Sequence, residues 1–210
     1  MSTHAVSAEA APRRALFFGD SLVAGIGDPA GGGWVTRIAA ACFAAGQPLS
    51  IYNLGVRRET SVEVAARWRA EATPRIPPTG DCRIVLSFGA NDTTIEDGSV
   101  RVCPERSCEA LGTILDEANS LGLPVLLVGP APVDDPDQNP RIGALTESFA
   151  EVCRQRDVPF IAVLEPLEQS QVWMSEVAGA DGAHPAAGGY ETIAELLING
   201  GLLSWLTAPH

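Results

Sequence analysis

A serine near the start of the sequence and an aspartate–histidine pair near its end could together perform acyl transfer. The serine is Ser21, within Gly19-Asp20-Ser21-Leu22, and the pair is Asp181 and His184. The other two histidines lie at the two ends of the chain, so any histidine base within the fold must be His184. A serine hydroxyl becomes nucleophilic when a histidine takes its proton, and an aspartate on the other imidazole nitrogen fixes the tautomer. These residues therefore predict a nucleophile, a base and an orienting acid.

Acyl transfer also requires hydrogen-bond donors for the oxyanion that develops on the substrate. Gly55 follows one apolar run, and Asn91 lies in Gly89-Ala90-Asn91-Asp92 after another. We expect the N–H groups of Ser21 and Gly55 and the side-chain amide of Asn91 to form the oxyanion hole. A glycine suits this role because a Cβ would obstruct close approach of the substrate. The aspartates that precede Ser21 and follow Asn91 are expected to hold loop backbone rather than to act on substrate.

An alternating pattern of short apolar runs and amphipathic segments must position these side chains. Helical periodicity predicts helices around residues 35–42, 108–118, 142–152 and 190–197. Because strands and helices alternate, we expect a three-layer α/β/α fold with a parallel sheet covered on both faces. The strand-like runs are Ala15–Phe18, Ser50–Leu54, Arg83–Phe88, Pro124–Val128 and Pro159–Val163.

The expected order of these strands brings the chemistry together. Five strands in this alternation most often adopt the flavodoxin-like order 2-1-3-4-5. The carboxyl ends of strands two, one and three are then neighbours, which places Ser21, Gly55 and Asn91 at one edge of the sheet. We expect a single catalytic domain over residues 14–210, preceded by a disordered lead-in over residues 1–13.

The composition narrows the possible chemistry and partners. The chain contains no lysine, which excludes Schiff-base chemistry and a phosphate-binding loop ending in Gly-Lys-Ser/Thr. With one interior histidine, a metal centre with two or three histidine ligands is excluded, and we expect no metal and no cofactor. A formal net charge of −12 disfavours nucleic acid and anionic membrane surfaces as partners.

The sequence also suggests where the protein works. No apolar run reaches the roughly 20 residues of a membrane-spanning helix, and the N-terminal residues lack the apolar stretch of a secretory signal. The five cysteines are an odd number without a zinc-binding spacing, which favours a reducing cytoplasm. A small-molecule ester is the expected partner, and the oligomeric state is left open.

Four blocks occur in a set order along the sequence: Phe18-Gly19-Asp20-Ser21-Leu22, then Gly55, then Gly89-Ala90-Asn91-Asp92, then Asp181-Gly182-Ala183-His184-Pro185. They resemble the four blocks of the SGNH hydrolases, the GDSL esterase and lipase family, and they span residues 18–185. The resemblance implies a flavodoxin-like fold, a triad of Ser21, Asp181 and His184, and an oxyanion hole completed by Gly55 and Asn91. It also implies hydrolysis of carboxylic esters or thioesters through an acyl-enzyme on Ser21, without metal or cofactor.

Two positions depart from the family pattern and bear on the substrate pocket. Val23 stands where Ser or Thr is common, and Arg58 stands where the loop after Gly55 often has a second glycine. Leu22, Val23 and Arg58 are therefore expected as possible substrate contacts, with Arg58 favouring an anionic or polar group. The alternative is that Arg57 and Arg58 pair with nearby carboxylates.

Other functions remain open at this stage. The same site would serve an acyltransferase, because water and alcohols compete for one acyl-enzyme. A non-catalytic module would instead bind a phosphate or nucleotide in the flavodoxin-like crevice, although the segment 25–30 is a poor dinucleotide fingerprint because it begins well beyond the strand and contains a proline. The path of residues 164–183 is not predicted, and we expect Trp173 and Met174 in it to line an acyl pocket. Acyl length and leaving group are left open.

Overall fold

A five-stranded parallel sheet forms the centre of the computed structural model, which describes residues 13–47 and 49–208. The order β2-β1-β3-β6-β7 is 2-1-3-4-5 when its strands are counted along the chain, so the predicted fold class is confirmed. All neighbouring strands of this sheet pair in parallel. The expected lead-in lies, except for Arg13, outside the described residues. The strands are β1 (Arg14–Gly19), β2 (Ser50–Gly55), β3 (Cys82–Ser87), β6 (Val125–Val128) and β7 (Phe160–Ile161).

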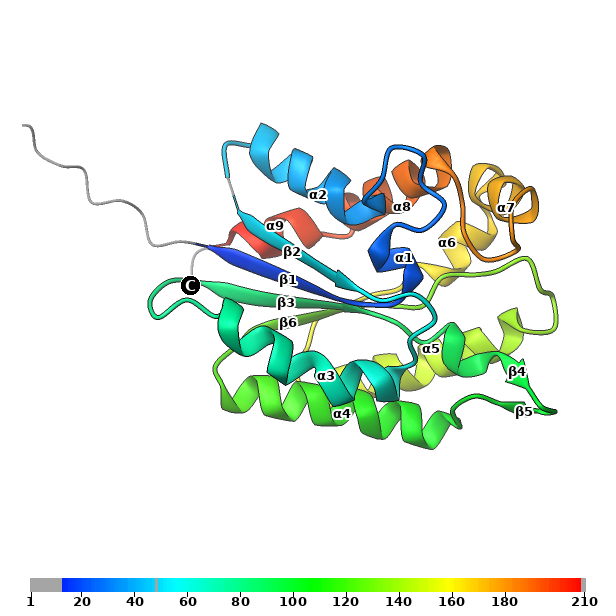
Figure 1. Cartoon of the computed structure of the whole chain (residues 1–210), viewed down its shortest axis with the longest axis horizontal. Helices are drawn as coiled ribbons and strands as arrows, with labels where there is room; N and C mark the ends of the chain where they lie inside the picture. The colour runs from blue at the N-terminus through cyan, green and yellow to red at the C-terminus, as the bar shows by residue number, and fades with distance from the viewer. Residues whose placement is uncertain (1–12, 48, 209–210) are drawn as a thin grey trace, which may run out of the picture.

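Helices cover both faces of the sheet, as Figure 1 shows. One layer contains α2 (Gly33–Ala44), α8 (Ala187–Asn199) and α9 (Leu202–Thr207); the other contains α3 (Ser61–Ala72), α4 (Pro104–Ser120) and α5 (Asn139–Arg154). Successive side chains of a strand point to opposite faces. Phe17 of β1 accordingly packs edge-on against Trp34 of α2, whereas Phe18 belongs to the cluster that contains Trp68 of α3.

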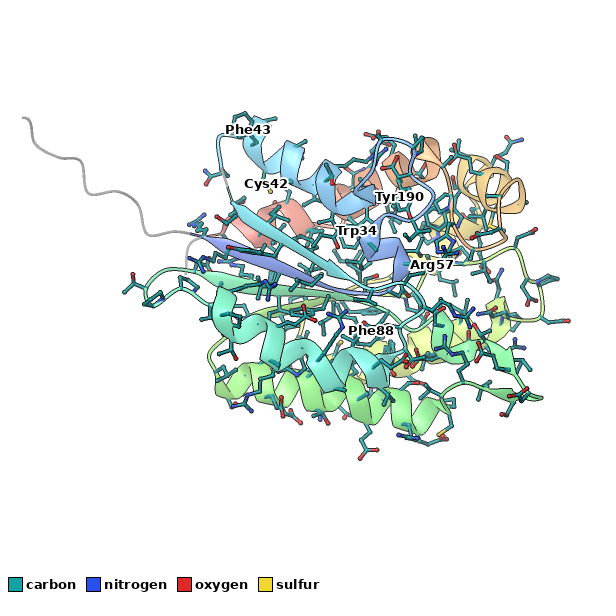
Figure 2. The ribbon with its side chains drawn as sticks, in the orientation of Figure 1. Trp34, Cys42, Phe43, Arg57, Phe88 and Tyr190 are labelled. Carbon is teal, nitrogen blue, oxygen red and sulfur yellow. The ribbon has the colours of Figure 1, made fainter. Side chains whose placement is uncertain are left out.

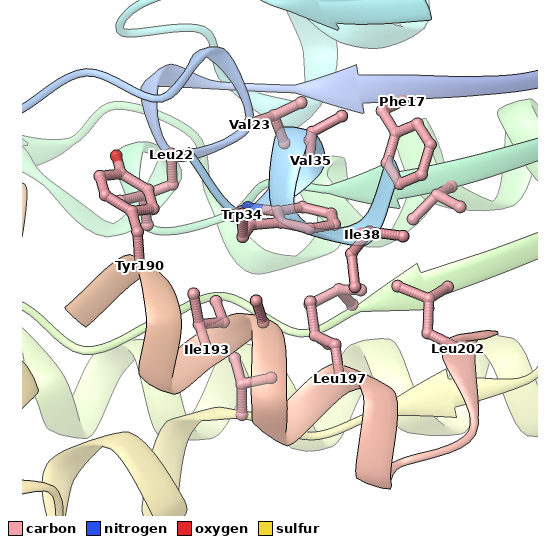
Figure 3. Close-up of a cluster of buried hydrophobic side chains, with 14 of the residues drawn as sticks. Phe17, Leu22, Val23, Trp34, Val35, Ile38, Tyr190, Ile193, Leu197 and Leu202 are labelled. Carbon is pink, nitrogen blue, oxygen red and sulfur yellow. The ribbon is translucent and has the colours of Figure 1, made fainter. Parts of the chain in front are cut away.

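The core on the α2 and α8 face extends to the end of β1, where the next helix starts. This helix is α1 (Ser21–Ala24). Figure 3 shows Leu22 and Val23 of α1 in the same cluster as Trp34 and Tyr190. Val23, Trp34 and Tyr190 are fully buried. Packing of these apolar side chains therefore holds α1, and with it Ser21, against the end of the sheet.

Several elements were not predicted from the sequence. The path of residues 164–183 consists of α6 (Leu164–Glu168), α7 (Gln171–Ala178) and the turn that follows. The strand expected over residues 159–163 is only two residues long as β7. No helix among the described residues has the length and apolar character needed to cross a bilayer. The remaining elements are η1 (Thr73–Arg75), η2 (Asn91–Thr93) and a hairpin of β4 (Ile95–Glu96) and β5 (Ser99–Val100). Neither these elements nor α3 was predicted from the sequence.

Candidate active site

Ser21 is the first residue of α1, directly after β1. The side chain of Asp20 caps this short helix by accepting a hydrogen bond of 3.0 Å from the Leu22 N–H, and Gly25 ends it with a left-handed φ of 80°. The tight passage from strand to helix needs Gly19, since a Cβ there would lie 1.9 Å from the Ser87 carbonyl oxygen. Ser21 thus lies in the first turn of a helix, where N–H groups lack partners within the helix.

His184 and Asp181 are joined by the hydrogen bond that the sequence predicts. The imidazole Nδ1 lies 2.7 Å from Asp181 Oδ2 and 3.0 Å from Oδ1. Asp181 Oδ1 also accepts the backbone N–H groups of Ala183 and His184. Although burial alone would raise it, the pKa of Asp181 is lowered by these hydrogen bonds. The aspartate is therefore an anion at neutral pH and holds the Nδ1–H tautomer, which leaves Nε2 for a second partner.

The backbone around residue 27 packs closely against His184. Gly27 has a φ of 89°, and a Cβ on it would lie 2.7 Å from the Pro185 carbonyl oxygen and 3.1 Å from the His184 Cβ. Tyr190 fastens the same loop, because its hydroxyl donates a hydrogen bond of 2.6 Å to the Ile26 carbonyl. Gly27 is thus a site residue that sequence reasoning missed. The signal in the sequence was the pair of glycines at positions 25 and 27, because glycine readily adopts a left-handed φ. In the structure both glycines have a left-handed φ and form a turn rather than a nucleotide-binding loop.

Asn91 lies at the start of η2, after β3. Its amide nitrogen donates to the Glu59 carbonyl at 3.0 Å and lies 3.4 Å from Asp20 Oδ2, a long contact that an oxyanion could displace. Burial raises the pKa of Asp20 to about 7, opposed by the hydrogen bond from Leu22 and reinforced by the nearby Asp92 carboxylate. Asp20 and Asn91 therefore lie in contact with each other beside Ser21.

The Gly55 N–H, expected as an oxyanion donor, is already hydrogen-bonded within the protein. Its N–H donates to Asn53 Oδ1 at 3.0 Å, while the next residue, Val56, donates to the Gly19 carbonyl of β1. Because successive backbone N–H groups of a strand point to opposite sides, the Gly55 N–H faces away from β1 and toward the Asn53 side chain. A glycine is required at position 55 for packing, since a Cβ on this residue would lie 2.3 Å from the Ala24 backbone nitrogen. In this conformation the Gly55 N–H could serve as an oxyanion donor only after leaving Asn53 Oδ1.

Arg58 occupies an unusual backbone conformation in the loop after β2. Its φ of 69° is left-handed, which is uncommon for a residue other than glycine. The side chain is exposed and pairs with Glu96 at 2.6 Å, which agrees with the alternative that it pairs with a nearby carboxylate. The neighbouring Arg57, shown at this end of the sheet in Figure 2, lies 3.8 Å from Asp181 Oδ2.

Asp92 ties the Asn91 turn to two helices. Its fully buried carboxylate accepts hydrogen bonds from the N–H and the hydroxyl of Ser61 at the start of α3, and from the hydroxyl of Ser107 in α4 at 2.6 Å. Burial raises the pKa of Asp92, with these hydrogen bonds acting in the opposite direction. Asp92 and the capping Asp20 hold backbone, in line with the role that the sequence suggests for both.

A cavity of about 310 Å³ collects most of the expected site residues. Ser21, Asn91, Asp181 and His184 all line it, and no hydrogen bond joins Ser21 to His184 within the described part of the chain. A larger hollow of about 690 Å³ lies at the opposite ends of the strands, next to Trp205, and contains none of these residues. The cavity, rather than the larger hollow, is the candidate active site. Its other walls are Asp20, Leu22, Ala90, Thr94, Val133, Asp134, Asp135, Gln138, Gly182 and Ala183.

Among the expected substrate contacts only Leu22 lines this cavity. Val23 is fully buried in the core, and the exposed side chain of Arg58 pairs with Glu96 outside the lining residues. Trp173 and Met174 were expected to line an acyl pocket, and this was wrong. Trp173 is fully buried and its indole N–H donates to the Pro132 carbonyl, while Met174 packs against the core. Val133, Asp134, Asp135 and Gln138 line the cavity instead.

No group of three or more His, Cys, Asp or Glu side chains that could hold a metal ion is assembled within residues 13–47 and 49–208.

Comparisons with known proteins find one matching family model and solved structures of the same fold. A family model described as the GDSL-like Lipase/Acylhydrolase family matches residues 17–192. The lipase/acylhydrolase from Enterococcus faecalis is 25% identical, with a TM-score of 0.73, over 90% of this chain and 95% of that chain. TesA is 25% identical, with a TM-score of 0.74, over 90% and 98%. Axe2, an acetylxylan esterase from Geobacillus stearothermophilus, is 16% identical and shares the fold, with a TM-score of 0.73 over 91% and 94%. No curated protein matches the chain.

Proposed function

The chain belongs to the GDSL-like lipase/acylhydrolase family, and on this premise we propose that it hydrolyses carboxylic esters through an acyl-enzyme on Ser21. The family supports ester hydrolysis in general. The observation that carries the finer proposal is the convergence of Ser21, Asn91 and the Asp181–His184 pair on one cavity. Thioesters remain within the proposed range of substrates.

In the proposed reaction His184 Nε2 takes the proton of the Ser21 hydroxyl as Oγ attacks the ester carbonyl. Asp181, an anion held on Nδ1, stabilises the imidazolium that forms. The imidazolium then gives its proton to the departing alcohol, and the acyl group stays on Ser21 Oγ. A water molecule, deprotonated by the same histidine, attacks the acyl-enzyme and releases the carboxylic acid and the free serine.

Donors for the oxyanion are proposed to be the Ser21 N–H, the Asn91 side-chain amide and a backbone N–H of the loop after β2. Arg58 is the best candidate for this last donor. The carbonyl of the next residue, Glu59, already binds the Asn91 amide, so this stretch of backbone lies beside the site. The Arg58 N–H has no hydrogen-bond partner among the described residues. A left-handed φ at Arg58 turns the peptide in a way that usually requires glycine, the residue common at this position in the family.

Steady-state hydrolysis of p-nitrophenyl acetate tests the proposal. Ser21→Ala and His184→Ala should each lower kcat by a factor on the order of 10³ or more, because the acyl-enzyme can then no longer form or break down at an appreciable rate. Arg154→Ala, at an exposed pair with Glu151 on α5, is the matched control and should keep wild-type turnover. Wild-type turnover in Ser21→Ala would exclude the mechanism.

Hydrolysis and transfer to an alcohol share the first half of this reaction. Product analysis with added acceptor alcohols separates them, because a transferase gives a new ester where a hydrolase gives the acid. A binding module without catalysis would give neither product.

A further inference from the structure

Gln138, just before the first residue of α5, is a wall of the cavity that the proposed reaction does not use. The residue is only 9% exposed. Its side-chain nitrogen donates to the Ala90 carbonyl at 2.9 Å and contacts the hydroxyls of Thr93 and Thr94 at 3.1 and 3.2 Å. A backbone carbonyl only accepts hydrogen bonds, so the nitrogen must face Ala90 and the orientation of the amide is determined.

This orientation leaves the amide oxygen without a partner. Within residues 13–47 and 49–208 no group donates a hydrogen bond to Gln138 Oε1. The oxygen is also not among the fully buried polar atoms that lack a partner, so solvent or a ligand can reach it. Because Gln138 lines the cavity and is otherwise buried, the cavity is where Oε1 can be reached. Leaving such an acceptor unpaired and without water is unfavourable, so a ligand that fills the cavity must bring a donor to it.

The other polar groups on the same wall are also acceptors. Asp134 and Asp135 line the cavity next to Gln138, and ionised carboxylates only accept. Asp135 Oδ1 is occupied by the N–H groups of Asp137 and Gln138. No lysine or arginine is among the residues that line the cavity. An anionic substituent would therefore meet like charge here, and a plain alkyl group would leave Oε1 unpaired.

We propose that Gln138 Oε1 is a specificity determinant that accepts a hydrogen bond from a hydroxyl group of the substrate. The substrates are then esters that carry free hydroxyls near the scissile bond, such as partial esters of polyols or sugars. A neutral hydroxyl fits better than an ammonium group, because the buried acceptor on this wall is the uncharged amide of Gln138, while Asp134 and Asp135 lie nearer to solvent. This inference rests on the proposed esterase function and adds the class of ester.

Two acetates that differ only in hydroxyl groups provide the kinetic test. Glyceryl monoacetate and propyl acetate have the same acyl group and the same number of carbons in the alcohol. We expect the wild-type kcat/KM to favour glyceryl monoacetate by roughly two- to tenfold, the equivalent of one net hydrogen bond. Gln138→Leu should reduce this ratio to about one.

Thr93→Val is the matched control. It removes one anchor of the Gln138 nitrogen, as Gln138→Leu also does, but it keeps Oε1, and Thr93 does not line the cavity. It should lower both rates by a similar factor and keep the ratio. A wild-type ratio near one, or a ratio that Gln138→Leu leaves unchanged, overturns the proposal.

Direct binding separates this inference from the esterase proposal. The same two acetates are titrated into the Ser21→Ala variant by calorimetry, with and without Gln138→Leu. Tighter binding of glyceryl monoacetate that is lost with Gln138→Leu supports the hydroxyl contact even if the wild type turns over neither ester. Equal binding of the two esters overturns it even if Ser21-dependent hydrolysis is observed.

Discussion

Each proposed catalytic side chain is held by contacts that do not depend on substrate. Asp181 holds the His184 ring, the Glu59 carbonyl holds the Asn91 amide, and the Asp20 cap places Ser21 in the first turn of its helix. Catalytic groups that are pre-positioned in this way need not reorganise when the transition state forms. In the proposed mechanism the negative charge therefore develops at a point that these groups already surround.

Removal of the Asn91 amide tests whether it contacts the transition state. Asn91→Ala should lower kcat by about 10²–10³ with little change in KM, since an oxyanion donor acts mainly in the transition state. Steady-state kinetics with a neutral ester measures both constants, and thermal unfolding checks that the variant is folded. A kcat within threefold of wild type would remove Asn91 from the oxyanion hole.

Asp20 makes stability depend on pH. Burial raises its pKa from 3.8 to about 7, so the folded protein binds this proton more tightly than the unfolded chain. Its contribution to stability is therefore complete below about pH 4 and is lost as the pH rises through about 7. Asp20→Asn keeps the capping oxygen but cannot ionise. Between about pH 5 and about pH 8 the variant should lose less free energy of unfolding than wild type, by on the order of 2 kcal/mol.

Urea unfolding of both proteins at the two pH values measures this difference. Asp28→Asn provides a comparison, because the pKa of Asp28 is lowered, chiefly by its hydrogen bond with Arg37, so its stabilisation is lost at acidic rather than neutral pH. An identical loss of stability in wild type and Asp20→Asn would show that the carboxyl is not protonated in the folded state.

At the scale of elements, Asp92 fastens η2 to α3 and α4. Asp92→Ala would leave the Ser61 N–H and two hydroxyls without their acceptor, at a cost of about 2–4 kcal/mol in the free energy of unfolding. It should also lower kcat, because Asn91 adjoins it in the same turn. Urea unfolding and steady-state kinetics measure the two effects.

Ser107→Ala removes only one of these hydrogen bonds and is the graded control. It should cost about 1 kcal/mol or less and leave kcat nearly unchanged. An Asp92→Ala variant as stable as Ser107→Ala would contradict the role assigned to this buried carboxylate.

Part of the architecture could be predicted because the signals are local. Alternation of apolar runs and amphipathic segments predicts the sheet order that the structure has. Asp181 and His184 are three residues apart, so their hydrogen bond forms within one turn. The α3 helix was missed because its apolar face is narrow, with Val64 and Trp68 among polar residues, although the Thr60–Glu63 hydrogen bond marks its start.

The errors concern properties that depend on tertiary contacts. The present partner of the Gly55 N–H could not be predicted either, because its direction follows from strand pairing and the Asn53 side chain. Trp173 was placed in the pocket because the path of its helix was unknown, and the structure packs it against Pro132. The unpaired oxygen of Gln138 depends on the Ala90 carbonyl, which fixes the orientation of the amide, and no local pattern in the sequence marks it.

At the scale of the whole molecule, charge should influence which esters reach the site. The chain carries a formal net charge of −12, and the cavity has carboxylates in its wall. An anionic ester should therefore associate slowly at low ionic strength, and its kcat/KM should rise severalfold between about 10 mM and about 0.5 M salt. A neutral ester of the same alcohol should change little. Equal salt dependence for the two esters would show that the electrostatic field of the molecule does not reach the cavity.

A cytoplasmic location stays a prediction from the sequence.

The most direct test of the account is the mass of the protein after reaction with a fluorophosphonate, which captures an activated serine. We predict a single adduct on Ser21 in the wild type, located by peptide mapping, and no adduct in Ser21→Ala or His184→Ala under the same conditions. An adduct on another residue, or labelling of wild type no faster than of His184→Ala, would contradict the assignment of Ser21 and His184 as nucleophile and base.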